Sequence, residues 1–130
     1  MLVRPHAANV GDPENPRTMD RLVGLLGAGA VRWFYKTDCC GGGLSMSNDK
    51  LVTDLVDNIL VRAREAGASA LATACPLCLA NLEMRRSREK ELPVFYFTEL
   101  MGLAFNLTGC RRWIKKHLVD PQPLLTSLGL

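Results

Sequence analysis

Four of the five cysteines in this 130-residue chain stand in two tight pairs, and cysteine thiolates bind metals or take part in redox chemistry. Cys39 and Cys40 run directly into three glycines, and Cys75-Pro76-Leu77-Cys78 follows after residues 41–74. Neighbouring side chains of an extended chain point apart, so Cys39 and Cys40 can face one site only where the backbone turns sharply. Glycine permits the positive φ that such a turn needs. The pattern predicts a metal or redox site that uses both pairs.

Three chemistries remain open for these cysteines from the residues alone. Zinc takes four thiolates, but structural zinc sites usually separate the ligands of a pair by about two to four residues, unlike Cys39 and Cys40. Cys75-Pro76-Leu77-Cys78 also resembles a thioredoxin- or glutaredoxin-type dithiol, an interpretation that leaves Cys39 and Cys40 unused. A multinuclear iron–sulfur cluster uses all four cysteines, because neighbouring thiolates can bind different irons. The fifth cysteine, Cys110, is interpreted as a buried or incidental thiol.

Helices that alternate with short apolar strands would position both pairs. The turn-rich start favours a first helix capped by Asn15 and closed by Gly27, and Ser47 or Asn48 is expected to cap a long amphipathic helix that Gly67 ends. The apolar stripe of this long helix consists of Leu51, Val52, Leu55, Val56, Ile59, Leu60 and Ala63. Further helices are predicted over 76–88, over 99–106 after a Thr98 cap, and as one turn after Gly109. Strands are predicted over 31–35, 70–73 and 93–97.

This alternation predicts an α/β fold, a single domain over residues 1–130 with a small parallel sheet flanked by helices. Ligands of such sheets gather at the carboxyl ends of the strands, which is where both cysteine pairs are expected. The composition, 48% hydrophobic and 22% charged, is that of a globular protein. No apolar run approaches the roughly 20 residues of a membrane span, and the first residues do not resemble a signal peptide. We therefore expect a cytoplasmic protein without a membrane span.

The net charge of +3 is unevenly distributed along the chain. Residues 1–83 hold eight Lys/Arg against nine Asp/Glu, whereas residues 84–130 hold eight against four. The surplus lies in 85–88 and 111–117, which we interpret as solvated helix faces, with a docking surface for an acidic partner as the alternative. His6 and His117 are likewise interpreted as solvated. Nucleic-acid binding is not expected, since the net charge is modest and aromatic residues make up only 6% of the chain.

The order Cys-Cys-Gly, a long interval, then Cys-Pro-x-Cys resembles the cysteine-rich CCG domain found in the B subunit of heterodisulfide reductase, specifically its C-terminal half. The similarity extends beyond the cysteines and covers nearly the whole chain. The stretches that carry it are 2–5, 12–16, 19–22, 35–37, 75–78, 96–100 and 119–121.

The resemblance implies a Rossmann-like domain that holds a non-cubane four-iron, four-sulfur (4Fe-4S) cluster. Its ligands here would be Cys39, Cys40, Cys75 and Cys78. It also implies an oxidoreductase component for electron transfer to, or reduction of, a disulfide, with iron–sulfur electron-transfer subunits as partners.

The family pattern has a further cysteine and strand ahead of residues 2–5, and a further CCG domain. We therefore expect a sheet without its first strand and a site lacking one ligand, so that the chain would be inactive alone. The open sheet edge would pair with another chain, a homo-oligomer being one form of such pairing. The alternative hypothesis is a non-catalytic interaction module that keeps the fold with a structural zinc or no metal.

Overall fold

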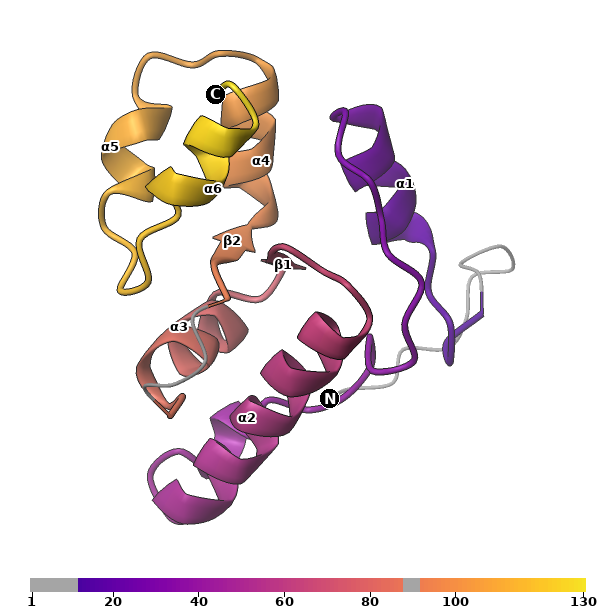
Figure 1. Cartoon of the computed structure of the whole chain (residues 1–130). Coiled ribbons are helices and arrows are strands. Elements are labelled where there is room, and N and C mark those ends of the chain that lie inside the picture. The colour runs from indigo at the N-terminus through magenta and orange to yellow at the C-terminus, as the bar shows by residue number, and fades with distance from the viewer. Residues whose placement is uncertain (1–11, 88–91) are drawn as a thin grey trace.

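The computed structural model describes residues 12–87 and 92–130. Its elements follow in the order α1 (Thr18–Leu25), η1 (Gly42–Leu44), α2 (Asp49–Glu65), β1 (Leu71–Thr73), α3 (Pro76–Met84), β2 (Val94–Tyr96), α4 (Phe97–Ala104), α5 (Cys110–Ile114) and α6 (Gln122–Ser127). The two strands pair in parallel, with Leu71 beside Val94 and Thr73 beside Tyr96, and α3 connects them. In Figure 1 the strands lie at the centre, with α2 and α3 below and α4 to α6 above. The predicted α/β class with a small parallel sheet is confirmed.

Helix α2 forms as the sequence predicts, because both its ends and its apolar face are encoded locally. The Asn48 side chain accepts a hydrogen bond from the Leu51 N–H at 3.1 Å, and Gly67 adopts a positive φ of 84° just beyond the helix. The buried face consists of Val52, Val56, Ile59, Leu60 and Ala63. These side chains form the centre of a core with Leu82 and Val94, so α2 packs beneath α3 and β2.

The predicted strand over residues 31–35 is wrong. This segment has no regular secondary structure and contacts α2 through side chains instead. Trp33 packs against the core, and the Arg62 guanidinium lies 5.7 Å from the centre of the Tyr35 ring. Strand propensity reflects how well a side chain fits a half-buried surface, and here Trp33 and Tyr35 find that surface beside α2 whereas Phe34 is exposed.

The first helix is displaced from its predicted start. Helix α1 begins at Thr18 rather than residue 16, its N-cap is Arg17 rather than Asn15, and no side chain caps it. Gly27, with φ of 89°, follows the helix as predicted. No α1 residue is buried, and the helix borders a cavity of about 740 Å³ that also reaches β1 and α6.

Helices α3 and α4 also depart from their predicted ends. Helix α3 ends at Met84 rather than near residue 88. Arg86 is half-buried and donates to the carbonyls of Leu82 and Leu92, at 2.6 and 2.7 Å, so it is not part of a solvated helix face. Helix α4 begins at Phe97 after the N-cap residue Tyr96, whose N–H donates to the Glu99 carboxylate at 2.8 Å, so Thr98 lies inside the helix and is not its cap.

The C-terminal region contains two short helices where one turn was predicted. Pro121 and Pro123 lie at the start of α6 rather than after the last helix. Helices α5 and α6 bury Cys110, Ile114 and Leu125 in a second core with Phe95. Over the described residues, no helix combines the length and apolar character needed to cross a membrane.

Replacing Leu60 with alanine tests the principal core. Leu60 is fully buried, so Leu60→Ala should lower the free energy of unfolding by about 2–5 kcal/mol in urea titrations. Leu51→Ala makes the same change on the same helix at a side chain that is 41% exposed, and should cost less than about 1 kcal/mol. Equal losses from the two variants would contradict this packing.

Candidate metal centre

Two cysteines from separate segments meet between η1 and the start of α3. The Cys40 and Cys78 sulfurs lie 3.2 Å apart, and Cys40 is buried whereas Cys78 is half-buried. Two thiolates on one zinc ion would lie about 3.8 Å apart, from a Zn–S bond of ~2.3 Å and tetrahedral angles. The tertiary structure therefore brings one member of each predicted pair to a separation close to that of ligands of one metal.

The other two cysteines lie on the exposed side of this contact. Cys75 is the N-cap residue of α3, one turn before Cys78. The Cys39 sulfur accepts a hydrogen bond from the Gly41 N–H at 3.4 Å. Within residues 12–87 and 92–130, no three His, Cys, Asp or Glu side chains are already grouped tightly enough to hold a metal ion. The structure thus brings Cys40 into contact with Cys78, and Cys78 in turn hydrogen-bonds Cys75.

The start of α3 distributes negative charge unequally between its two cysteines. Hydrogen bonds from the Cys78 N–H and thiol lower the pKa of Cys75, as expected for an anion at a helix N-terminus. Burial, together with hydrogen bonds to Cys40 and Cys75, raises the pKa of Cys78. Cys75 is therefore the thiol that ionises more readily, and it is accessible to a reagent or a metal.

Glycines allow the two cysteine segments to approach each other. Gly41 has a positive φ of 71°, which lets the chain turn immediately after Cys40. A Cβ atom on Gly42 would lie 3.1 Å from two carbon atoms of the Leu77 side chain and 3.6 Å from the Cys40 sulfur. The glycines thus provide both the turn and the close approach that the sequence pattern predicts.

Asn81, a residue to which the cysteine pattern does not point, fixes this approach. Its side chain is buried, donates to the Cys40 carbonyl at 2.8 Å and accepts from the Ser45 hydroxyl at 2.9 Å. Asn81 lies three residues after Cys78, on the same side of the helix. A lone polar residue in the otherwise apolar stretch 76–82 was the available signal.

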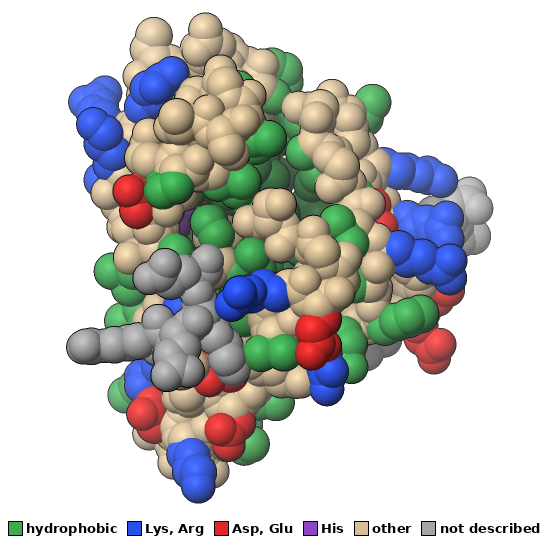
Figure 2. All heavy atoms as spheres, viewed as in Figure 1, with side chains coloured by type: hydrophobic (Ala, Val, Ile, Leu, Met, Phe, Trp, Pro, Cys, Tyr) green, Lys and Arg blue, Asp and Glu red, His purple; other side chains and the backbone are tan. Residues whose placement is uncertain are grey.

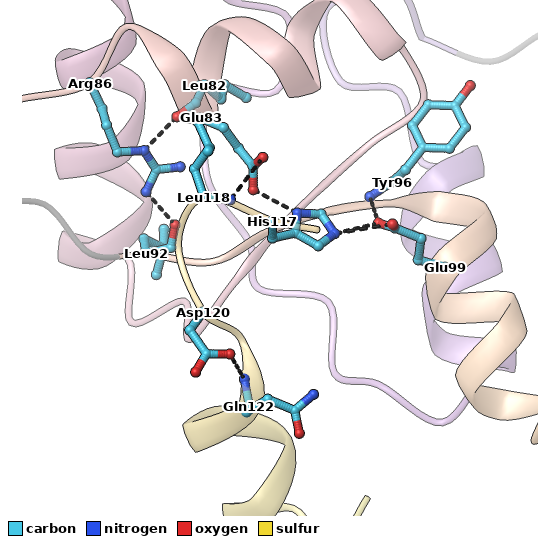
Figure 3. A network of polar contacts seen from close by, with 10 residues as sticks. All are labelled: Leu82, Glu83, Arg86, Leu92, Tyr96, Glu99, His117, Leu118, Asp120 and Gln122. Carbon is cyan, nitrogen blue, oxygen red and sulfur yellow. Dashed lines mark hydrogen bonds and ion pairs between the residues drawn. The ribbon is translucent and has the colours of Figure 1, made fainter. Parts of the chain in front are cut away.

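A second polar network attaches the end of α3 to the C-terminal half of the chain (Figure 3). His117 Nδ1 lies 2.6 Å from a Glu83 oxygen, and its Nε2 lies 3.0 and 3.1 Å from the two Glu99 oxygens. Each ring nitrogen of His117 thus lies within hydrogen-bond distance of a different carboxylate, so the ring links Glu83 to Glu99. The His117 side chain is 4% exposed, so its interpretation as solvated is wrong. His6 lies outside the described residues.

The last cysteine, Cys110, is buried as predicted and belongs to the C-terminal core. Its sulfur lies 3.5 Å from the Glu99 carbonyl, to which it donates, and no contact links it to the other four cysteines in the part of the chain that the structure describes. Burial raises the pKa of this thiol. Cys110 is thus a structural residue of the α4–α5 contact.

Comparison with known proteins identifies the class. The sequence profile of the cysteine-rich domain named CCG matches residues 3–83, which include both cysteine pairs. This match covers more than half of the chain, and the chain belongs to the cysteine-rich CCG domain family.

Relatives with assigned names are oxidoreductase components. The B subunit of the ferredoxin/F(420)H(2)-dependent CoB-CoM heterodisulfide reductase of Methanosarcina acetivorans is 28% identical over 137 residues, covering 98% of this chain and 46% of that protein. A protein of Archaeoglobus profundus named as similar to the B subunit of heterodisulfide reductase is 30% identical, covering 71% and 34%. The 8-methylmenaquinol:fumarate reductase membrane anchor subunit of Wolinella succinogenes is 25% identical, covering 85% and 41%. This chain spans less than half the length of each of these relatives.

Removing the Asn81 side chain tests its role at the centre. Asn81→Ala leaves the Cys40 carbonyl and the Ser45 hydroxyl without this partner, and should lower the free energy of unfolding by about 1–3 kcal/mol. It should also slow oxidation of the Cys40–Cys78 pair by a mild disulfide reagent, measured by peptide mapping. Asn58→Ala, on the helix α2, is the control because it gains the same helix propensity. Identical behaviour of the two variants would exclude the positioning role.

Removing His117 should lower the free energy of unfolding. His117→Gln removes the ring that joins two nearly buried carboxylates, and we expect a loss of about 1–3 kcal/mol in the free energy of unfolding. Arg62→Gln removes an exposed ion pair with Glu65 and the contact with the Tyr35 ring, and should cost clearly less. Equal losses from the two variants would refute the role of His117 as a buried link between Glu83 and Glu99.

Proposed function

We propose that this chain is an iron–sulfur domain of a heterodisulfide-reductase-type oxidoreductase, which takes part in electron transfer to a disulfide or in its reduction. The supporting observation is the 3.2 Å approach of the Cys40 and Cys78 sulfurs in a member of the CCG family. Relatives named as heterodisulfide reductase components support the same reaction class. Reduction of a disulfide consumes two electrons and two protons and yields two thiols.

The donor set fits an iron–sulfur cluster, which prefers thiolate ligands. Cys39, Cys40, Cys75 and Cys78 would hold it, and the resemblance of the cysteine pattern favours the non-cubane 4Fe-4S type. When bound, such a cluster supplies one-electron steps. Cys39 and Cys75 would supply the exposed ligands and Cys40 and Cys78 the more buried ones, and the positive φ of Gly41 lets the chain turn beside the Cys39–Cys40 pair.

The chain's own residues determine the surroundings of that cluster. Cys75 provides the readily ionised thiol at the exposed end, because hydrogen bonds from Cys78 lower its pKa. Leu77 lies over Gly42 on the outer side of the site, and the buried Cys40 lies on its inner side. Asn81 holds the two ligand segments together through the Cys40 carbonyl.

Electron-transfer subunits of a larger complex are the proposed partners, and a cytoplasmic location is proposed with them. Heterodisulfide reductase relatives more than twice as long as this chain favour assembly with further domains. The sheet described here has two strands, and the cavity beside β1 leaves room for pairing with another chain, including a second copy.

Metal analysis after anaerobic purification tests the proposed function. We expect about four irons and four acid-labile sulfides per chain, with a brown colour. Cys75→Ser should lose most of the iron because it removes an accessible ligand. Cys110→Ser replaces a buried cysteine outside the site and should retain it, provided that circular dichroism shows a folded chain.

Two outcomes would contradict this function. Zinc near one per chain without sulfide would favour the non-catalytic module with a structural metal. Iron content unaffected by Cys75→Ser would exclude the ligand assignment.

A further inference from the structure

Helix α5 and the turn after it present four cations on a firmly anchored part of the chain. Arg111, Arg112, Lys115 and Lys116 are all exposed. On its inner face, Cys110 and Ile114 pack into the second core and are 2% and 0% exposed. Figure 2 shows the corresponding cluster of blue side chains at the upper left, where α5 lies in Figure 1. The cations are therefore carried by a fixed part of the surface.

These cations have no counter-ions in the part of the chain that the structure describes. None of the four forms an ion pair there. The nearest acids in sequence are engaged elsewhere, because Glu99 contacts His117 and Asp120 accepts from the Gln122 N–H. Like charges one helical turn apart, such as Arg111 and Lys115, repel each other by a few tenths of a kcal/mol. An acidic partner would remove this repulsion.

An exposed tryptophan stands in the middle of the basic stretch. Trp113 is 44% exposed, while one edge of its ring lies 3.3 Å from the position of a Cβ on Gly102. The packed edge holds the ring in place, and its exposed part lies among the cations because Trp113 stands between Arg112 and Lys115 in the sequence. Tryptophan and arginine are enriched among the residues that dominate protein–protein binding, so this composition indicates an interface.

The same tryptophan connects the basic surface to the cysteine site. A groove of about 370 Å³ is lined by Pro76, Leu79, Tyr96, Thr98, Glu99 and Trp113. Pro76 directly follows Cys75, and the Tyr96 hydroxyl donates to the Ala74 carbonyl at 3.0 Å. A protein seated on α5 and over this groove would therefore lie beside the Cys75 loop.

We propose that α5 and the groove beside it form the docking surface for an acidic electron-carrier protein. The choice of an electron carrier rests on the proposed function. The choice of an acidic protein rests on Trp113 and on the four cations, which form no ion pair within residues 12–87 and 92–130. A nucleic acid fits less well, because the groove beside the cations is mainly apolar and aromatic and adds no further cation for a phosphate backbone.

Titration with a purified acidic ferredoxin as the probe tests this surface. We expect wild-type binding at low ionic strength that weakens with added salt, since complementary charges attract over roughly 10 Å at 0.1 M salt. The double variant Lys115→Glu/Lys116→Glu should raise the Kd for the ferredoxin by about tenfold or more. Arg21→Glu/Arg64→Glu makes the same change in net charge at exposed positions of α1 and α2, and should change Kd less than about twofold.

Equal losses in the two double variants, or no binding of the wild-type chain, would overturn the proposal. Tighter binding of a short DNA duplex than of the ferredoxin would overturn it in favour of nucleic acid. Iron and sulfide are measured on the same preparations. If the chain contains iron but its affinity for the ferredoxin does not depend on the α5 charges, only the docking surface is refuted. If the affinity depends on the α5 charges but the chain contains no iron, the docking surface is supported and the proposed function is refuted.

Discussion

The hydrogen bond from Asn81 to the Cys40 carbonyl is the constraint on which the cysteine site depends. The two cysteine segments come from different parts of the chain, and the Cys39–Cys40 segment is not itself part of a strand or helix. A buried carbonyl needs a partner, and Asn81 supplies it from the helix that carries Cys78. Its second bond, from Ser45, fixes the far end of the glycine turn. The Asn81 side chain thereby holds both ends of the loop from Cys40 to Ser45 against α3.

Helix α3 is consequently the element that joins the two halves of the molecule. Its first turn carries Cys78 after the Cys75 N-cap, and its last turn carries Glu83, which contacts His117 (Figure 3). Through His117 the same network reaches Glu99 at the start of α4. The cysteine site and the basic helix α5 are thus attached to a common support. A partner bound at α5 would be held at a fixed position relative to Cys75.

The parts of the fold that sequence predicted are those with local physical causes. Helix α2 has its own cap, apolar stripe and terminating glycine, and β1 and β2 are short apolar runs that lead into helices. Residues 31–35 carry equally strong strand residues, but strand formation needs a neighbouring strand, and Trp33 and Tyr35 contact the α2 side of the core instead. The caps of α1 and α4 were misplaced because the observed N-cap residues, Arg17 and Tyr96, are not of the types that favour this position.

The sequence by itself determined the chemistry available to this protein: two cysteine pairs, glycines that allow a turn, and a basic C-terminal third. These features are local, since residue type and spacing fix them. Only the tertiary structure decided which cysteines meet, placing Cys40 against Cys78 and leaving Cys39 exposed. It also converted His117 from an expected surface residue into a buried bridge between Glu83 and Glu99. Such contacts join residues distant in sequence, and no local pattern encodes them, because they form only when helices and strands pack together.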